Sequence, residues 1–254
     1  EDSPHTPHLQ LRKQVLDEQA KRNRRTIIVD SNLFLYLDKQ NTKRYLRYSI
    51  DGVFPTTGNY FSDNPDPNRW LKVSQDLGIR TREWRTQGNH ILICLQRNGG
   101  WSMKGLDNQD WARDIITRIR QFSDRPIIIR GHPGDRRAGK YLNPKEKAYK
   151  LHGLDNVHIS DRLNRSLQMD LNNAWCTVVY NSSPAVASAI EGIPVFVDDP
   201  VDCQAQDVCN TDIANIEMPD IFDRESWLQK LSMCHWNFDE LTSGEAWEHM
   251  RKYV

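Results

Sequence analysis

The chain has 254 residues, 38% of them hydrophobic, and carries 34 Lys and Arg against 34 Asp and Glu. No apolar run approaches the roughly 20 residues that a membrane-spanning helix needs, and a zero net charge argues against a protein that mainly coats nucleic acid. The first residues lack the apolar segment of a signal peptide, and the five cysteines show no CxxC spacing. We therefore expect a cytoplasmic protein with reduced thiols, no structural zinc site and no membrane partner.

The N-terminal third predicts few regular elements. Its patterns indicate a helix over residues 9–24, strands over Thr26–Phe34 and Tyr45–Val53, and a short helix Trp70–Leu77 that ends at Gly78. This part is short for a complete Rossmann-like half, so we expect residues 1–87 to form a reduced domain.

From residue 88 onward, predicted strands and helices alternate. The strands are His90–Leu95, Ile127–Ile129, Val157–Ile159, Cys176–Tyr180 and Ile193–Val197; the helices are about Asp107–Phe122, Leu167–Asn172, Pro184–Glu191, Arg224–Ser232 and Phe238–Lys252. Such alternation predicts an α/β fold with a parallel sheet and helices on both faces. We place the second domain at residues 88–235 and expect residues 236–254 to form a helix that returns to the first.

Two polar clusters follow predicted strands in this second part. Arg130, His132 and Pro133 come directly after the apolar run Ile127–Ile129, and Asn181-Ser182-Ser183 come directly before the helix that begins at Pro184. Ligands of open α/β sheets collect at the carboxyl ends of the strands, and a helix N-terminus offers free N–H groups to an anion. The clusters therefore predict an anion site, although Ser183 alone would also suit an ordinary helix cap.

A glycine-rich turn, Asn98–Lys104, follows the strand that ends at Leu95. Gly100 would let the backbone approach a phosphate closely, and Lys104 would neutralise it. The stretch matches neither the Walker A pattern nor G-x-G-x-x-G, and a tight turn between a strand and a helix explains it equally well.

Together these motifs resemble the donor-binding half of GT-B glycosyltransferases, in particular the capsule-polysaccharide and bacterial sialyltransferase group. His132-Pro133 and Ser182-Ser183 match the His-Pro and Ser-Ser pairs that hold the nucleotide-sugar phosphate there, and Glu191 matches the acid that meets the ribose. The resemblance implies two Rossmann-like halves, with donor binding at residues 88–235 and the acceptor side at 1–87. It also implies a metal-independent enzyme without a cofactor that uses a nucleotide-sugar, with a UDP-sugar as our first expectation.

Two aspartates are candidates for the catalytic base. Ser49-Ile50-Asp51-Gly52 resembles the acidic D/E-D/E-G element of sialyltransferase-like enzymes, whose acid accepts the proton of the acceptor hydroxyl. Asp51 could equally belong to an Asp-Gly turn. Asp30, at the end of the first strand, is the competing candidate, and Glu83 is a third.

The stretches RYSIDGVFPTTGNY, LQRNGGWSMKG and FDELTSGEAW resemble small proteins of T4-like phages, some of which are thought to glycosylate hydroxymethylcytosine in DNA. This resemblance implies a 5-hydroxymethyl pyrimidine in DNA as acceptor, and the host cytoplasm as location. Basic runs at residues 10–25 and 111–140 would contact its phosphates. Three alternatives stay open: a glycan acceptor, a non-catalytic nucleotide-binding module, and a phosphoesterase that uses His132 with His158.

Overall fold

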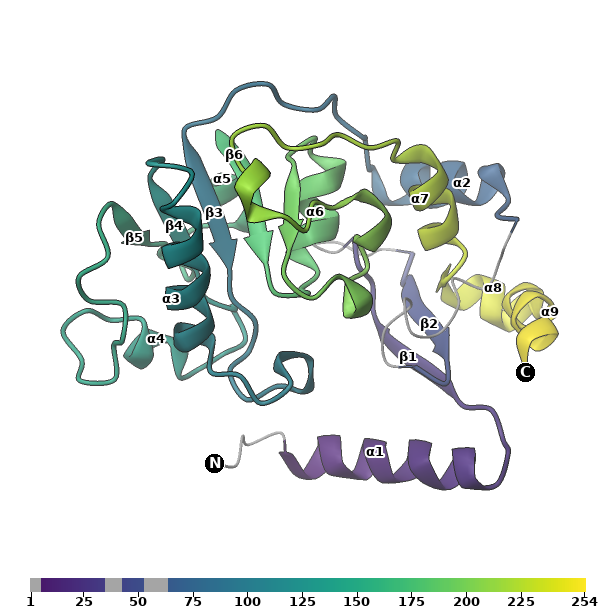
Figure 1. The fold of residues 1–254 in the computed structure, drawn as a ribbon. Coiled ribbons are helices and arrows are strands. Elements are labelled where there is room, and N and C mark those ends of the chain that lie inside the picture. The colour runs from purple at the N-terminus through teal and green to yellow at the C-terminus, as the bar shows by residue number, and fades with distance from the viewer. Residues whose placement is uncertain (1–5, 35–42, 53–63) are drawn as a thin grey trace.

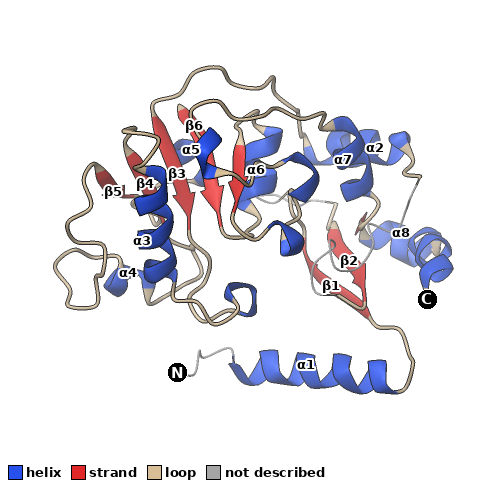
Figure 2. Cartoon of the chain, viewed as in Figure 1, coloured by secondary structure: helices blue, strands red, loops and turns tan. Residues whose placement is uncertain are grey.

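The computed structural model describes residues 6–34, 43–52 and 64–254 of the chain. In this part, a five-stranded sheet and a three-stranded sheet lie side by side (Figures 1 and 2). The larger sheet contains β3 (His90–Cys94), β4 (Ile127–Arg130), β5 (Val157–Ile159), β6 (Ala174–Val179) and β7 (Val195–Val197). The smaller contains β1 (Ile27–Ser31), β2 (Leu46–Ile50) and β8 (His235–Trp236).

The larger sheet is parallel throughout and has the strand order β5-β4-β3-β6-β7. Following the chain from β3, the strands β4 and β5 lie on one side of β3, and the next strands, β6 and β7, lie on its other side. This reversal leaves a crevice between the carboxyl ends of β3 and β6, where open α/β sheets bind their ligands. The predicted α/β class with a parallel sheet in the C-terminal half is confirmed.

Helices cover both faces of this sheet, which explains its continuous apolar strands. Along β3, Ile91 and Ile93 pack in one core cluster with α3 (Asn108–Ile119), while Leu92 packs in the other with α6 (Pro184–Ile190). The remaining helices are α1 (Thr6–Lys21), α2 (Pro67–Leu77), α4 (Ala138–Tyr141), α5 (Leu167–Leu171), α7 (Glu225–Ser232), α8 (Phe238–Ser243) and α9 (Glu245–Met250).

Two predicted elements differ from the structure for local reasons. The helix expected over Phe238–Lys252 is divided into α8 and α9 because Gly244 adopts a left-handed φ of 87° and ends α8. The strand expected from Ile193 begins at Val195. The N–H of Ile193 is bonded to Ser188 at the end of α6, and Pro194 has no N–H to donate.

The three-stranded sheet is completed by the end of the chain. β8 pairs antiparallel with β2, and Arg69 on α2 makes a buried bidentate ion pair with Glu240 on α8. His235 accepts the N–H of Leu33 at Nε2 and meets the carbonyl of Leu231 through Nδ1 at 2.8 Å. Burial lowers the pKa of His235 to about 3, so the imidazole is neutral and can make both contacts.

In the N-terminal part, β1 pairs antiparallel with β2. A Rossmann-like half requires parallel strands joined by crossovers, and the described N-terminal strands do not have that pairing. One hydrophobic cluster also runs from Tyr48 and Ile50 across the expected boundary at residue 87 to α6 and α7. The GT-B arrangement and the divisions at residues 87 and 235 stay predictions.

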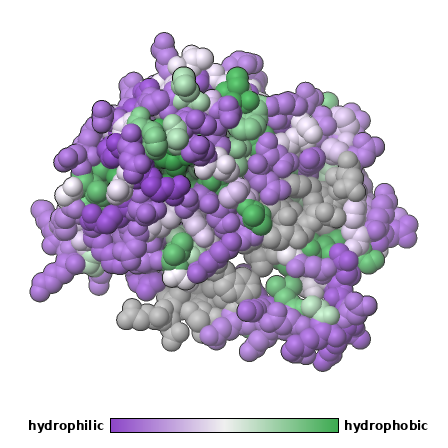
Figure 3. All heavy atoms as spheres, in the orientation of Figure 1, coloured by the Kyte–Doolittle hydropathy of each residue, from purple (hydrophilic) through white to green (hydrophobic). Residues whose placement is uncertain are grey.

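The face of the molecule drawn in Figure 3 is mostly hydrophilic, with apolar residues in small separate patches. Among the described residues, no helix has the length and apolar character needed to cross a membrane.

Candidate functional site

A cavity of about 1120 Å³ lies between the two sheets. One wall is made by α1 and β1, and the opposite wall by the loops after β3, β4, β5 and β6. The arrowheads of β3 and β6 point toward α1 in Figure 1, so this second wall is the carboxyl edge of the parallel sheet. The cavity therefore occupies the topological switch point, where the sequence places its anion site.

The structure brings most of the predicted residues to this cavity. Its lining includes Asp30, Gly100, Arg130, His132, Pro133, Asn181, Ser182 and Ser183. Asp51, Lys104 and Glu191 lie outside the described lining.

Asn181 joins the two strands that border the crevice. Its Oδ1 accepts a hydrogen bond from Gln96 Nε2 at 2.7 Å, and its Nδ2 donates to Asp199 at 3.0 Å and to the carbonyl of Ser102 at 3.1 Å. Because these bonds occupy the amide, Asn181 holds the loops after β3 and β6 together.

His132 lines the cavity, and one of its ring nitrogens is a hydrogen-bond donor. The N–H of Gly134 donates to Nδ1 at 3.0 Å, so the proton of the neutral ring is on Nε2. Burial, together with the nearby Arg97 and Arg162, lowers the pKa of His132 despite the opposing charge of Asp135. A neutral imidazole with Nε2–H can donate to a phosphate oxygen at physiological pH.

We expect His132→Ala to weaken nucleotide-sugar binding by about 10- to 100-fold, the loss of one hydrogen bond to a charged group. The pKa of His132 is lowered from its ordinary value of 6.5, so the ring is neutral well above that pH and the wild-type affinity should stay constant from pH 7.5 to 8.5. Isothermal titration across this range tests both points. If the affinity instead increased as the pH fell through this range, the charged imidazolium form of His132 would be the one that binds the ligand.

Ser182 and Ser183 differ in their environments. The Oγ of Ser182 is buried and has no hydrogen-bond partner among the described residues. Ser183 is the N-cap of α6, but its side chain makes no capping bond and it is exposed. The expected side-chain cap is therefore absent from this described helix end, because Ser183 adopts αR rather than extended backbone angles. An unpaired buried hydroxyl in a cavity wall is a group that a ligand would satisfy.

We expect Ser182→Ala to leave the free energy of unfolding unchanged or slightly higher, because an unsatisfied buried hydroxyl costs about 1–3 kcal/mol. Nucleotide-sugar affinity should nevertheless fall about tenfold. Ser183→Ala is the matched control for a lost hydroxyl and should have a smaller effect on affinity. Chemical denaturation and titration of both variants check this, and equal affinity loss in the two would remove the distinction.

Arg130 is held by a buried carboxylate. Its Nη1 lies 2.5 Å from Oδ2 of Asp170 on α5, and Asp170 also accepts bonds from Ser160 at 2.6 Å and Arg165 at 2.8 Å. Burial would raise the pKa of Asp170, but these hydrogen bonds outweigh it and lower the pKa. Arg130 thus keeps a fixed position at the cavity wall with part of its charge already neutralised.

The two candidate bases occupy different places. Asp30 lies on β1 in the cavity lining, and its Oδ2 is 2.9 Å from Nη2 of Arg47, the cross-strand neighbour on β2. Asp51 adopts a left-handed φ of 58° after β2, pairs with Arg25 and accepts the N–H of Thr26 at 2.7 Å. Its contacts are those of a turn that closes the β1–β2 pair.

Lys104 and Glu191 are engaged elsewhere. Lys104 Nζ lies 2.7 Å from Asp199 and 2.9 Å from Asp202. Glu191, at the far end of α6 from Ser183, lies 2.8 Å from Arg82. The structure does not bring these two residues to the described cavity wall.

Sequence reasoning missed several arginines of the cavity: Arg47, Arg97, Arg162 and Arg165. Arg97 could have been found, because it follows β3 just as Arg130 ends β4. Arg162 and Arg165 lie in the loop after the short predicted strand Val157–Ile159, and no sequence pattern marked them.

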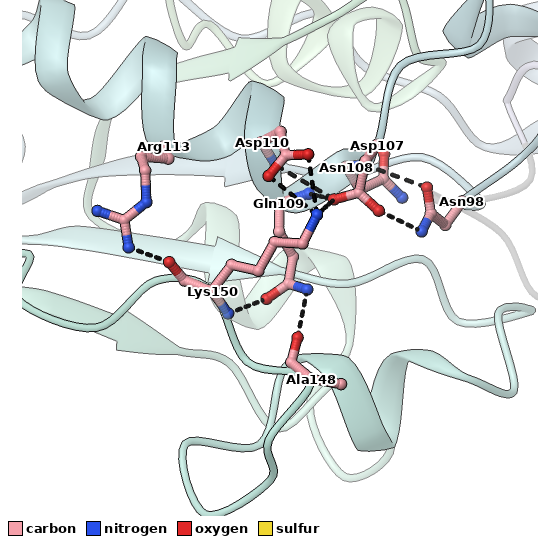
Figure 4. Close-up of polar contacts among 8 residues, drawn as sticks. All are labelled: Asn98, Asp107, Asn108, Gln109, Asp110, Arg113, Ala148 and Lys150. Atoms are coloured by element: carbon pink, nitrogen blue, oxygen red, sulfur yellow. Dashed lines mark hydrogen bonds and ion pairs between the residues drawn. The ribbon is translucent and has the colours of Figure 1, made fainter.

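The turn that carries Arg97 and Gly100 is fixed to the N-terminus of α3 (Figure 4). Asn98 donates to Asp107 at 3.0 Å and accepts the N–H of Asn108 at 3.2 Å, while Asp107 caps α3. Lys150 in turn binds Asp107 and Asp110. These contacts place the backbone after β3 rigidly beside the cavity.

In the part of the chain that the structure describes, no group of three or more His, Cys, Asp or Glu side chains is arranged to hold a metal ion. His158, the expected partner of a phosphoesterase His132, is exposed on the edge strand β5 and is not in the described cavity lining.

No protein-family model matches the chain, and no curated protein matches it. Among solved structures it is similar to KpsC of Thermosulfurimonas dismutans, described as a β-Kdo 2,7 transferase. The identity is 15% and the TM-score 0.47, over 82% of this chain and 68% of that one.

Proposed function

We propose that the protein is a GT-B-type glycosyltransferase that moves a sugar from a nucleotide-sugar to a hydroxyl acceptor. One observation carries the proposal: the cavity at the switch point has hydrogen-bond donors and guanidinium groups on its sheet wall, and Asp30 on the opposite wall. Asp30 is the one carboxylate in the described lining. Such a site can neutralise a leaving phosphate on one side and accept a proton on the other.

In the proposed reaction, the acceptor hydroxyl attacks the anomeric carbon of the sugar. A new carbon–oxygen bond forms while the bond from that carbon to the phosphate oxygen breaks, and its electron pair stays on the phosphate. The acceptor's proton passes to Asp30, whose position Arg47 fixes. Asp30 already accepts the N–H of Ser31, but a carboxylate has about four acceptor positions and can bind a hydroxyl as well.

The departing phosphate gains negative charge in the transition state. His132 donates through Nε2–H, Ser182 through its unpaired hydroxyl, and nearby guanidinium groups supply positive charge. The proposal therefore assigns leaving-group stabilisation to side chains rather than to a metal ion or cofactor. A non-catalytic nucleotide-binding module would have no need of Asp30 in the opposite wall.

As acceptor we propose a 5-hydroxymethyl pyrimidine in DNA, with a polysaccharide or other glycan as the alternative. The observation that favours a polyanion is the placement of α1. Arg12 lies in the cavity lining, and Arg22 and Arg24 follow along the same exposed segment. The target base would have to leave the stack to reach the cavity. The second basic run contributes less than expected, because Arg118 pairs with Asp198 and Arg125 with Glu217.

The test is transfer of sugar to defined acceptors. The protein is incubated with UDP-, GDP- and CMP-sugars and either hydroxymethylcytosine-containing DNA or oligosaccharides, and the products are measured by mass spectrometry. We expect a hexose-sized mass increase on the modified nucleoside and none on unmodified cytosine. Transfer to oligosaccharides alone would move the acceptor to the glycan class, and no transfer with any pair would contradict the enzymatic proposal.

A further inference from the structure

Two guanidinium groups that have no ion-pair partner among the described residues act on His132. Arg97 comes from the loop after β3 and Arg162 from the loop after β5, and both line the cavity. Both charges act on the imidazole of His132, so both lie close to the point where we place the donor phosphate.

The guanidinium of Arg97 has a hydrogen-bond donor without a partner among the described residues. Its Nε is buried without a hydrogen-bond partner, and its guanidinium makes no ion pair within the ranges 6–34, 43–52 and 64–254. Its backbone is nevertheless held on both sides, since Asn98 donates its N–H to Asp135 at 3.0 Å and Gly100 donates to the carbonyl of Arg97. An arginine has five donors, and buried ones are normally satisfied. A ligand oxygen in the cavity is the partner that would satisfy them.

Arg162 is fixed in place without losing its charge. It donates from Nη1 to the carbonyl of Pro133 at 3.2 Å and from Nη2 to the carbonyl of Asp135 at 3.1 Å. Carbonyls orient the guanidinium but do not neutralise it, and its other N–H groups stay available. The backbone after His132 therefore positions Arg162 beside the ring.

The sheet wall carries an excess of positive charge. Its guanidinium groups are those of Arg97, Arg130, Arg162 and Arg165. Arg130 and Arg165 are both paired with the buried carboxylate of Asp170. Arg97 and Arg162 are the two whose charges no ion pair neutralises among the described residues, and unpaired charge in a partly buried wall is costly.

We infer that the site takes a donor with two adjacent negative charges, a nucleoside diphosphate sugar, and that Arg97 distinguishes its pyrophosphate from a single phosphate. The inference rests on the proposed function. In the bound donor each phosphate group carries one negative charge, so the pyrophosphate neutralises the two excess charges. A nucleoside monophosphate linkage supplies one, and would leave Arg97 without an anion.

The experiment compares nucleotides with two phosphate charges and nucleotides with one. The glucose that only the diphosphate sugars carry is the same for wild type and variant, so the change in their affinity ratio isolates the phosphate. Isothermal titration is performed with UDP-, GDP-, ADP- and CDP-glucose, with the four matching nucleoside 5′-methylphosphates, and with CMP-sialic acid. We expect one of the diphosphate sugars to bind about 10- to 100-fold more tightly than its methylphosphate, a difference typical of a hydrogen-bonded charge pair. Arg97→Gln should reduce this ratio to within about threefold, while binding of the methylphosphate changes little.

A second variant moves Arg97 instead of removing it. A Cβ built on Gly134 would lie 2.5 Å from Nη2 of Arg97, the far end of that side chain, and 3.1 Å from Cε1 of His132. Gly134→Ala should displace the guanidinium and lower the ratio, while its contact with His132 should weaken both ligands alike. Arg80→Gln, exposed and outside the described lining, is the control for lost charge. Three results would each overturn the inference without contradicting glycosyl transfer. These are equal affinity for the diphosphate sugar and the methylphosphate, an affinity ratio that Arg97→Gln leaves unchanged, and tighter binding of CMP-sialic acid than of any diphosphate sugar. Failure of every nucleotide to bind would overturn the proposed function as well.

Discussion

Asp30→Asn should reduce turnover by about 10²- to 10⁴-fold, the range that a general base contributes. The amide cannot accept the proton of the attacking hydroxyl, whereas its shape and its contact with Arg47 are nearly conserved. Donor affinity should change little, because Asp30 lies on the wall opposite the phosphate-binding side chains. Steady-state kinetics and donor titration on the same preparation separate the two quantities.

Asp51→Asn is the matched control for this variant. The same chemical change is made at a residue whose carboxylate closes a turn with Arg25 and Thr26 outside the described cavity lining. We expect turnover near that of the wild type. If Asp51→Asn lost the activity and Asp30→Asn kept it, the catalytic base would be Asp51. The assignment of Asp30 from its place in the described cavity lining would then be wrong.

Asp170→Asn should destabilise the fold by about 3–5 kcal/mol, because it removes the carboxylate that neutralises buried Arg130. The midpoint of thermal unfolding should fall by roughly 10 °C for a chain of this size. Asp124→Asn, exposed and on the surface before β4, is the control and should be nearly neutral. Differential scanning calorimetry of the two variants measures the difference.

The pH dependence of this effect has a defined sign. The pKa of Asp170 is lowered from its ordinary value of 3.8 in the folded protein, so the stabilisation is fully present above that value. It is lost as the pH falls through the folded-state pKa, since protonation removes the charge that Arg130 and Arg165 need. The stability difference between wild type and Asp170→Asn should therefore be constant from pH 5 to 8 and shrink below pH 4. A difference that persisted at pH 2 would show that packing, rather than charge, accounts for it.

The parallel sheet could be predicted because its signals are local. Apolar runs such as Ile127–Ile129 and the alternation of strands and helices predict an α/β fold with a parallel sheet. Gly78 ends α2 as expected. β8 could not be found, because it has two residues and exists through its pairing with β2. The antiparallel form of the smaller sheet likewise depends on this pairing between distant segments.

Strand ends predicted which residues line the described cavity better than they predicted the contacts of single residues. Arg130, His132 and Ser182 reach one cavity because parallel strands present their carboxyl ends on the same edge. Lys104 and Glu191 were assigned from a turn and a motif, but their charges are satisfied by Asp199, Asp202 and Arg82 from other parts of the chain. The ion-pair partner of a charged side chain depends on tertiary structure, so the sequence pattern could not predict these partners.

A crystal structure of the protein with a bound nucleoside diphosphate tests the central claim most directly. We predict phosphate oxygens within hydrogen-bonding distance of Nε2 of His132 and Oγ of Ser182, with Asp30 across the cavity from the position of the missing sugar. A nucleotide bound with its phosphates away from the carboxyl ends of β3, β4 and β6 would contradict the account.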